Sequence, residues 1–448
     1  MTVNCVLVGH NFIHEMQVIS QIFFSGYAFK FVNIVPPEGY AVLGRLDNKT
    51  CTGELYLDGN KISACTMPYE NKRSLMLAIF RVLKEATGQP TPWGALTGVR
   101  PAKQVRIWLD EGQSEAEITN RLSQEYMLRE DKIKLAIAVA HAEKKLKNKP
   151  GTGIYVGIPF CPSRCLYCSF VVAQKAGADA HLRYLDALAK ECANLPNDNV
   201  NTVYIGGGTP TTFSAKDFER LLQIAAPFAN NVEYTVEAGR PDSISIEKLH
   251  LMKDYGVNRI AINPQTLCDT TLERIGRAHT SKNFYKAYEM AQQIGFNNIN
   301  TDIIVGLPGE SIEDIQNTMA GLKEINPPHI TVHTLAIKRA SFLKERQAIS
   351  ADFGTIDKML SIASNACADM GLLPYYMYRQ KNTLGHFENV GWAKPGYESL
   401  YNVAMMAETQ TVFAAGAGAV TKILEGDLIT RKFNPKNIEI YIERMNTQ

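Results

Sequence analysis

The feature that most constrains the fold is an alternation of strand-like and helix-like segments that begins at Gly153. Short apolar runs predict strands at Ile154–Ile158, Thr202–Ile205, Glu233–Val236, Val257–Ile262, Asn298–Val305 and His329–Leu335. Longer segments predict the helices between them, at Ala180–Leu195, Ala215–Phe228, Ile246–Tyr255, Lys282–Ile294 and Ile312–Ile325. This alternation indicates an α/β fold whose parallel sheet has helical crossovers, either doubly wound or a partial barrel. In both forms ligands bind at the carboxyl ends of the strands.

The segments on either side of this repeat have a different pattern. Strands and helices are mixed before residue 90, and Asp58-Gly59-Asn60 predicts a hairpin turn between two antiparallel strands. Consecutive helices are expected from residue 98 to 148, with Ser114 as an N-cap. We therefore predict four parts: an N-terminal α+β domain at 1–90, a helical segment and linker at 91–150, the core at 151–340, and a C-terminal α+β extension on the substrate side at 341–448.

Composition indicates a soluble, cytoplasmic protein. Of 448 residues, 45% are hydrophobic and 21% are charged, and the net charge is +2. This balance gives no electrostatic case for nucleic acid or an acidic membrane as the main partner. No apolar run reaches the roughly 20 residues that span a bilayer. A secretory signal is not expected, because no Lys or Arg precedes Lys30 and Glu15 interrupts the first apolar stretch.

Three of the nine cysteines form a cluster in the sequence. Cys161, Cys165 and Cys168 follow the first predicted core strand with the spacing C-x3-C-x2-C. A loop can fold three thiolates around one metal cluster, and three ligands leave one iron open to another molecule. Structural zinc would need a fourth ligand, for which His181 is the nearest histidine. The remaining cysteines are expected to be small buried hydrophobes: Cys5, Cys51, Cys65, Cys192, Cys268 and Cys367.

Polar or glycine-rich loops follow the other predicted strands. The second strand leads into Gly206-Gly-Gly-Thr-Pro-Thr211, where glycines allow a ligand to approach backbone N–H groups closely. Later loops carry Glu237-Ala-Gly-Arg-Pro-Asp242, Asn263-Pro-Gln265-Thr266, Arg277-Ala-His279 and, beyond Asp302, Gly306-Leu-Pro-Gly-Glu310. Taken singly, each residue is as typical of a helix cap or a surface charge as it is of a binding site. Their repetition at successive strand ends favours a binding site.

The cysteine motif resembles the signature of the radical S-adenosylmethionine superfamily. The resemblance implies that Cys161, Cys165 and Cys168 bind a [4Fe-4S] cluster and that S-adenosylmethionine chelates the fourth iron. It also implies a low-potential electron donor, whose electron cleaves the cofactor to methionine and a 5′-deoxyadenosyl radical.

The wider set of motifs resembles the oxygen-independent coproporphyrinogen-III dehydrogenase family. It includes Tyr155-x-x-x-Pro-Phe-Cys161, the glycine loop and Asp302-x-x-x-Gly-Leu-Pro308, over residues 150–420. Trp93-Gly-x-Leu-Thr-Gly-Val-Arg-Pro101 resembles the variant with a longer N-terminal domain. The resemblance implies a partial (β/α)6-type barrel and these contacts to S-adenosylmethionine: Tyr155, Gly207, Gly208, Thr209, Glu237, Gln265, Arg277 and Asp302.

The activity that the resemblance implies is oxidative decarboxylation of two propionates to vinyls on a tetrapyrrole, coproporphyrinogen III, in haem biosynthesis. Alternatives are another tetrapyrrole-directed reaction (methyl transfer or haem ring opening) and a haem-binding chaperone without turnover. Candidates to bind the propionates are Arg240, Arg339, Arg379 and Lys381, although each alone is more typical of a solvated surface cation. Tyr375, Tyr376, Tyr378 and Trp392 could pack against a macrocycle, but core positions are commoner for such residues. Gly416-Ala-Gly-Ala419 would permit close backbone approach to the cofactor.

The sequence departs from this family pattern at three places. Gly157 stands where the family has histidine. Glu237-Ala-Gly-Arg-Pro-Asp replaces the usual acidic-Asp-Pro ending. The C-terminal His-Asn-x-x-Tyr-Trp element is present only as Glu388-Asn389-Val-Gly-Trp392. All three are expected near the substrate side of the site.

Overall fold

The structure is a computed structural model that describes residues 1–146, 151–170, 173–174, 176–336, 352–380, 383–426 and 428–447. Contacts divide the chain into two compact units. The first contains Met1–Ile137 with Arg379–Asn382, and the second contains Ala138–Tyr378 with Thr383–Gln448. The four-part division expected from the sequence stays a prediction.

The first unit contains a five-stranded sheet in the order β2-β1-β3-β4-β5. Its strands are β1 (Thr2–Val8), β2 (Ala28–Val32), β3 (Tyr40–Leu46), β4 (Thr50–Leu57) and β5 (Asn60–Pro68). Strand β1 is parallel to β2 and β3, whereas β3, β4 and β5 are antiparallel. The predicted hairpin turn is confirmed, since Asp58 and Gly59 have φ angles of 49° and 74° between β4 and β5.

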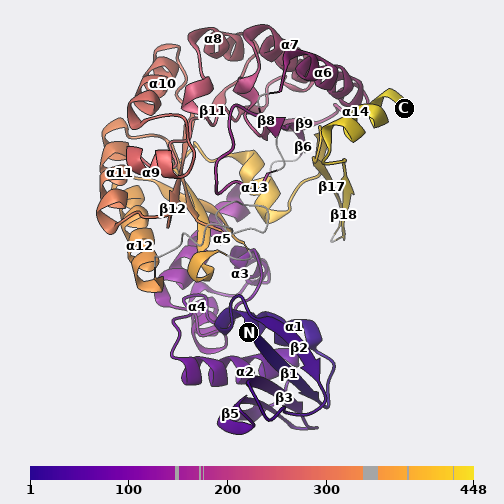
Figure 1. Ribbon diagram of the computed structural model, residues 1–448, viewed down its shortest axis with the longest axis vertical. Helices are drawn as coiled ribbons and strands as arrows, with labels where there is room; N and C mark the ends of the chain where they lie inside the picture. Colours follow the sequence, from indigo (N-terminus) through magenta and orange to yellow (C-terminus); the bar gives the residue numbers. More distant parts are fainter. Residues whose placement is uncertain are drawn as a thin grey trace. The chain divides into compact units, whose positions relative to one another are not determined.

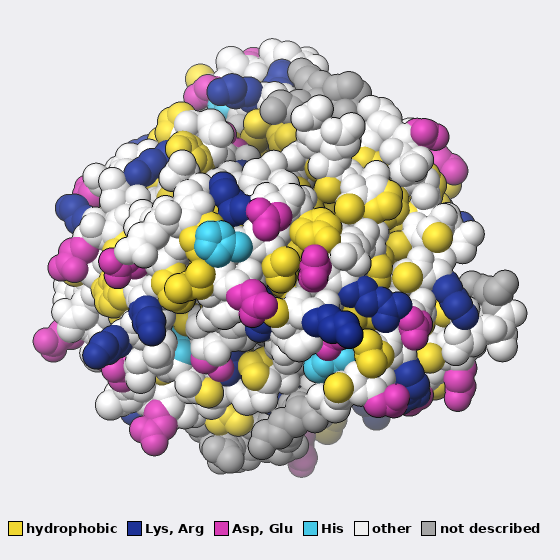
Figure 2. Space-filling model, turned by 90° about the horizontal axis from the view of Figure 1, so that it is seen from above, with side chains coloured by type: hydrophobic (Ala, Val, Ile, Leu, Met, Phe, Trp, Pro, Cys, Tyr) yellow, Lys and Arg dark blue, Asp and Glu magenta, His cyan; other side chains and the backbone are white. Residues whose placement is uncertain are grey.

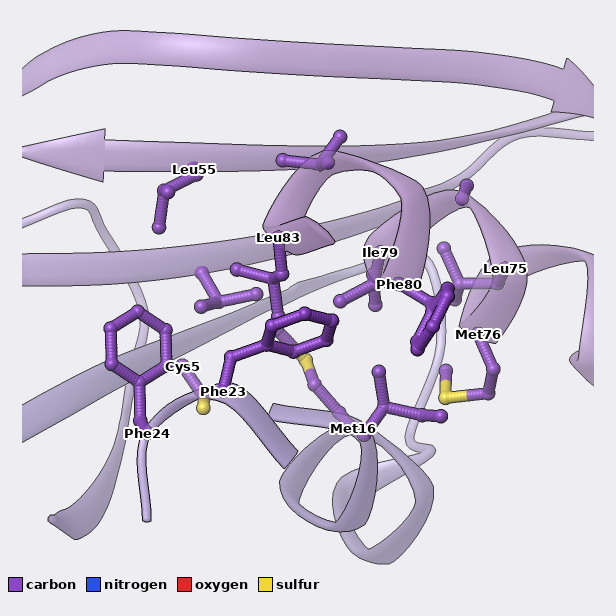
Figure 3. Close-up of a cluster of buried hydrophobic side chains, with 14 of the residues drawn as sticks. Cys5, Met16, Phe23, Phe24, Leu55, Leu75, Met76, Ile79, Phe80 and Leu83 are labelled. Atoms are coloured by element: carbon purple, nitrogen blue, oxygen red, sulfur yellow. The ribbon is translucent and has the colours of Figure 1, made fainter. Parts of the chain in front are cut away.

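Helices α1 (Ile13–Phe23) and α2 (Lys72–Thr87) supply most of the core of this unit. Figure 3 shows their side chains, among them Met16, Phe23 and Phe80, gathered against the sheet. Asn71 caps the start of α2 by accepting a hydrogen bond from Arg73 N (2.9 Å). Three more helices follow, with the predicted Ser114 cap at the start of the second: α3 (Pro101–Asp110), α4 (Glu115–Gln124) and α5 (Glu130–Leu146).

The second unit is built on one long mixed sheet. Its central strands are parallel neighbours in chain order: β6 (Thr152–Ile158), β9 (Val200–Gly207), β10 (Glu233–Val236), β11 (Arg259–Ala261), β12 (Ile299–Val305) and β13 (His329–Thr334). Every strand predicted between residues 153 and 335 is therefore present. The mixed α/β class is confirmed, and the curvature of a partial barrel stays a prediction.

Helices follow one another around the outside of these strands (Figure 1). They are α6 (Ala178–Ala193), α7 (Ala215–Ala225), α8 (Ile246–Asp254), α9 (Asp269–Arg274), α10 (Ser281–Gln293), α11 (Ile312–Ile325) and α12 (Phe353–Asp369). Polar side chains cap several of their starts; for example, Ser311 and Asp314 form a reciprocal capping box on α11. The short α9 was not predicted, because it is a single turn inside a loop.

The C-terminal part extends the same sheet at both edges. Strand β15 (Glu388–Ala393) pairs antiparallel with β13, and β16 (Val412–Ala415) pairs parallel with β6. Beyond them lie β14 (Leu373–Arg379), β17 (Val420–Glu425) and β18 (Leu428–Phe433), with helices α13 (Leu400–Ala407) and α14 (Ile438–Thr447). Both ends of the sheet are thus built from residues after 372.

The surface in Figure 2 carries acidic and basic side chains interspersed, without a continuous patch of one sign. Among the helices that the structure describes, none is both long and apolar enough to cross a membrane.

Gly53 on β4 provides a test of the first unit. A Cβ there would lie 2.6 Å from Ile79 N and 2.7 Å from Ile79 Cα, so the strand contacts the backbone of α2. Gly53→Ala should lower the free energy of unfolding by about 1–3 kcal/mol, because helix and sheet must move apart. Thr52→Ala on the same strand should cost less than about 1 kcal/mol. Urea unfolding of the full chain measures both; equal effects would contradict the close packing.

Candidate functional site

The three clustered cysteines lie on the loop that leaves β6. After Pro159 the chain forms β7 (Phe160–Cys161), a two-residue strand parallel to β8 (Ala173–Gln174). Cys165 is buried, whereas Cys161 and Cys168 are partly exposed. The loop is anchored to the end of α9, because Leu166 N donates to Ile275 O (2.9 Å). Its position at the carboxyl end of a parallel strand is the one expected from the sequence.

The thiols of this loop are in a buried environment and close to one another. Burial, together with the neighbouring Cys168 and Cys165, raises the pKa of Cys161 to about 11. Burial also raises the pKa of Cys168. Binding to a metal is one way to stabilise thiolates under these conditions.

The three thiolates can be compared with the donor set of an iron–sulfur cluster. Among the residues that the structure describes, no three Cys, His, Asp or Glu side chains are close enough to hold one metal ion. In an iron–sulfur cluster each thiolate binds a different iron, so the sulfur atoms need not converge on one point. His181, the only histidine near enough in sequence to complete a zinc site, lies instead between the rings of Phe160 and Phe213. The donor set therefore fits a cluster.

The glycine loop lies directly beside the cysteine loop. Gly208 N donates to Ile158 O (2.6 Å), and Thr209 N donates to Phe160 O (2.7 Å). A Cβ on Gly208 would lie 2.4 Å from Phe160 O, and Gly207 has a φ of +105°, so both positions require glycine. The hydroxyl of Thr209 is 3.5 Å from the sulfur of Cys161. The predicted neighbourhood of these two loops is thus present.

Glu237, which follows β10, is hydrogen-bonded to this glycine loop. Gly207 N donates to its Oε2 (3.3 Å). Burial, then the charge of Asp302, raises the pKa of Glu237 to about 7. Tyr155 on β6 is near the same carboxyl, and its ring stacks in a row with Tyr204 and Tyr401.

The pKa of Asp302 on β12 is shifted in the opposite direction to that of Glu237. Burial alone would raise the pKa of Asp302, but His333 lowers it overall by hydrogen bonding and charge. The Nε2 of His333 is 3.7 Å from Asp302 Oδ2, and Asn300 Nδ2 donates to Oδ1 (2.7 Å). His333 was not predicted as a site residue from the sequence. Its alternation with buried residues on the predicted strand His329–Leu335 was the available signal.

Gln265 and Arg277 connect the loops on this side of the sheet. Gln265 has a φ of +69°, and its backbone bonds to both Asp302 O and Ile304 N (each 2.9 Å). Arg277 is buried and donates to Gly239 O (3.5 Å) and Asn263 O (3.3 Å). Its charge also acts on Glu237. All the residues expected to bind cofactor therefore come from loops or strands at the carboxyl edge of the sheet, and their roles stay predictions.

The candidate propionate ligands that the structure describes have different environments. Arg240 is only 3% exposed, so the alternative of a solvated surface cation is wrong for it. Arg379 donates to Leu96 O (2.7 Å) and lies over the ring of Trp93. Arg339 and Lys381 lie outside the described residues. Tyr375, Tyr376 and Trp392 are buried, as expected for core residues.

The Gly416–Ala419 segment approaches the protein backbone. A Cβ on Gly416 would lie 2.3 Å from Gly157 O. Gly416 therefore allows a close approach to β6, and the approach of this segment to the cofactor stays a prediction. Gly157 is one of the departures from the family pattern, and Tyr184 also donates to its carbonyl (2.6 Å).

Comparison with known proteins identifies the family. The family model of the radical SAM superfamily matches residues 155–321. A relative in Bacillus subtilis, "oxygen-independent coproporphyrinogen-III oxidase-like protein HemZ", is 36% identical over 393 residues, which cover 83% of this chain and 78% of the relative. The chain belongs to the radical SAM superfamily and its HemZ-like family.

More distant relatives share the same core. The haem chaperone HemW of Lactococcus lactis is 33% identical, over 61% of this chain and 69% of that protein. The solved coproporphyrinogen III oxidase HemN from Escherichia coli superposes with a TM-score of 0.55 at 20% identity, over 69% of this chain and 72% of that one. This likeness shows a radical SAM fold similar to that of HemN. Proteins of the superfamily typically hold a [4Fe-4S] cluster and S-adenosylmethionine, which fits the donor set described above.

The ligand assignment leads to a direct test. Cys165→Ala should abolish assembly of the cluster, because a three-thiolate site cannot lose one ligand without opening a second iron. Iron and sulfide analysis with the visible spectrum of anaerobically reconstituted protein measures this. Cys192→Ala is the control, since that thiol is buried in α6 and should leave iron content unchanged. Full iron content in Cys165→Ala would overturn the assignment.

Proposed function

We propose that this protein is a radical SAM enzyme that converts coproporphyrinogen III to protoporphyrinogen IX without oxygen. The observation that carries the proposal is the 36% identity with an oxygen-independent coproporphyrinogen-III oxidase-like protein over 83% of the chain. The three-cysteine loop beside a glycine loop supports it, because that arrangement suits a cluster that takes an exogenous ligand.

For each of two propionates, the proposed reaction transfers one hydrogen atom to the radical, releases carbon dioxide and passes one electron to an external acceptor, which leaves a vinyl group. Bound together, the cluster and S-adenosylmethionine would supply the one-electron cleavage that generates a hydrogen-abstracting radical. A low-potential electron donor is required, and the tetrapyrrole is the substrate.

The chain's own residues would orient the cofactor. The glycine loop would let the cofactor approach the backbone closely, because Gly207 and Gly208 carry no side chain. Glu237 can pair with its ammonium, and the charged carboxylate of Asp302 can accept hydrogen bonds from its ribose hydroxyls. The buried guanidinium of Arg277, held by the carbonyls of Gly239 and Asn263, would fix the loops that carry these groups.

A second candidate function is haem binding without turnover. The HemW haem chaperones are related to this chain at 33% identity or less. Methyl transfer and haem ring opening are further possibilities for the same cofactors.

An anaerobic assay distinguishes these functions. Reconstituted full-length protein is incubated with S-adenosylmethionine, a strong reductant and coproporphyrinogen III, and mass spectrometry follows 5′-deoxyadenosine and the porphyrin products. Stepwise loss of two carboxyl groups, matched by cofactor cleavage, is the expected result. Cofactor cleavage without decarboxylation would move the proposal to haem or another tetrapyrrole. In a parallel incubation with haem in place of coproporphyrinogen III, stable haem binding with little cofactor cleavage would favour the chaperone.

The role of Glu237 predicts a pH dependence of cofactor binding. With a pKa of about 7, its carboxyl is mostly neutral at pH 6 and mostly charged at pH 8. Only the charged form pairs with an ammonium, so the affinity for S-adenosylmethionine should fall roughly tenfold in total between pH 8 and pH 6. Calorimetry of the reconstituted protein between pH 6 and 8 measures this dependence.

Glu237→Gln should bind weakly and without this dependence. Glu310→Gln is the matched control, because the pKa of Glu310 is also raised to about 7, chiefly by burial. The proposal would be contradicted if Glu310→Gln lost the pH dependence of binding and Glu237→Gln kept it. The titrating carboxyl would then be that of Glu310.

A further inference from the structure

Arg240 lies in the loop after β10 that departs from the family pattern. Its side chain is 3% exposed, although the loop is at the open edge of the sheet. A buried guanidinium is costly unless its charge and donors are satisfied. The contacts of the guanidinium therefore indicate the role of Arg240.

Asp242 holds the guanidinium in one orientation. Arg240 Nε donates to Asp242 Oδ1 and Nη2 donates to Oδ2, both at 2.9 Å. This bidentate pair fixes the plane of the fork. The loop itself is held by Ser243, whose hydroxyl donates to Arg240 O (2.8 Å) and is 2.6 Å from the hydroxyl of Thr211.

The third nitrogen points to the cysteine loop. Arg240 Nη1 is 3.6 Å from Cys165 Sγ and 3.4 Å from Ser163 O. Arg240 thus donates a hydrogen bond to one of the three clustered cysteines. Arg164 and Arg277 act on Cys168 through charge, and Arg240 acts in the same way on Cys161.

We propose that Arg240 is a positioning residue that donates an N–H hydrogen bond to the sulfur of Cys165 and raises the reduction potential of the cluster bound there. This inference rests on the proposed cluster site. Reduction adds negative charge, and an N–H donor beside a ligand sulfur stabilises the reduced state more than the oxidised state. The Arg240–Asp242 pair, oriented with its positive end toward the sulfur, would therefore make one-electron reduction easier.

The test is an EPR-monitored redox titration of the reconstituted full-length protein without substrate. Arg240→Gln should shift the reduction equilibrium about tenfold toward the oxidised cluster, which for one electron is about 59 mV lower. Arg240→Lys keeps the charge but loses the fork, so its potential should lie between those of Arg240→Gln and the unmodified protein. Arg220→Gln is the control, since it removes an arginine paired with Asp186 at the surface and should leave the potential unchanged.

The outcomes separate this inference from the cluster assignment. If the unmodified protein assembles no cluster, the proposed site fails and the inference fails with it. If the cluster assembles and its potential is the same in Arg240→Gln, Arg240→Lys and the unmodified protein, the residue only supports the loop and the inference alone is overturned. If Arg240→Gln cannot assemble a cluster, Arg240→Lys decides: a lowered potential supports the hydrogen bond, and an unchanged potential or a second failure to assemble contradicts it.

Discussion

The parallel pairing of β6 with β9 is the constraint on which the candidate site depends. Neighbouring parallel strands end at the same edge of a sheet, and the register places Gly157 opposite Gly206 and Ile158 opposite Gly207. The cysteine loop and the glycine loop therefore leave the sheet side by side. Backbone hydrogen bonds from Gly208 and Thr209 to Ile158 and Phe160 continue this pairing beyond the strands. A residue larger than glycine at Gly208 would separate the two loops.

Two buried carboxyl groups with opposite pKa shifts give this edge its electrostatic character. Glu237 has a raised pKa because it is desolvated and near Asp302, whereas Asp302 has a lowered pKa because His333 and Asn300 hydrogen-bond to it. Their environments thus let one carboxyl respond to pH near neutrality while the other stays charged. A pair of this kind can bind a cation at one position and hydroxyl groups at the other.

The sequence was sufficient for the positions of the core strands along the chain, because apolar runs and amphipathic helices depend on local burial. It was also sufficient for the location of the cysteines, because the loop that follows a buried parallel strand lies at the carboxyl edge of the sheet. It could not assign β15 and β16 to opposite edges of the core sheet, since a strand's partner depends on contacts distant in sequence. His333 was not identified and the burial of Arg240 was not predicted, because the residues that contact them come from other strands and loops.

The departures from the family pattern gain a physical explanation from these long-range contacts. A Cβ at Gly157 would approach the ring of Tyr155 to 3.2 Å and Ala415 O to 3.4 Å. Arg240 pairs with Asp242, and Gly391 leaves room for the ring of Tyr376, which a Cβ would approach to 1.7 Å. Asn389 is likewise occupied, since it accepts from Thr334 N (3.0 Å) and donates to Tyr378 O (3.3 Å). Gly157 and Arg240 thus lie where the chain packs tightly against itself. At both positions the residue is constrained by contacts within the chain.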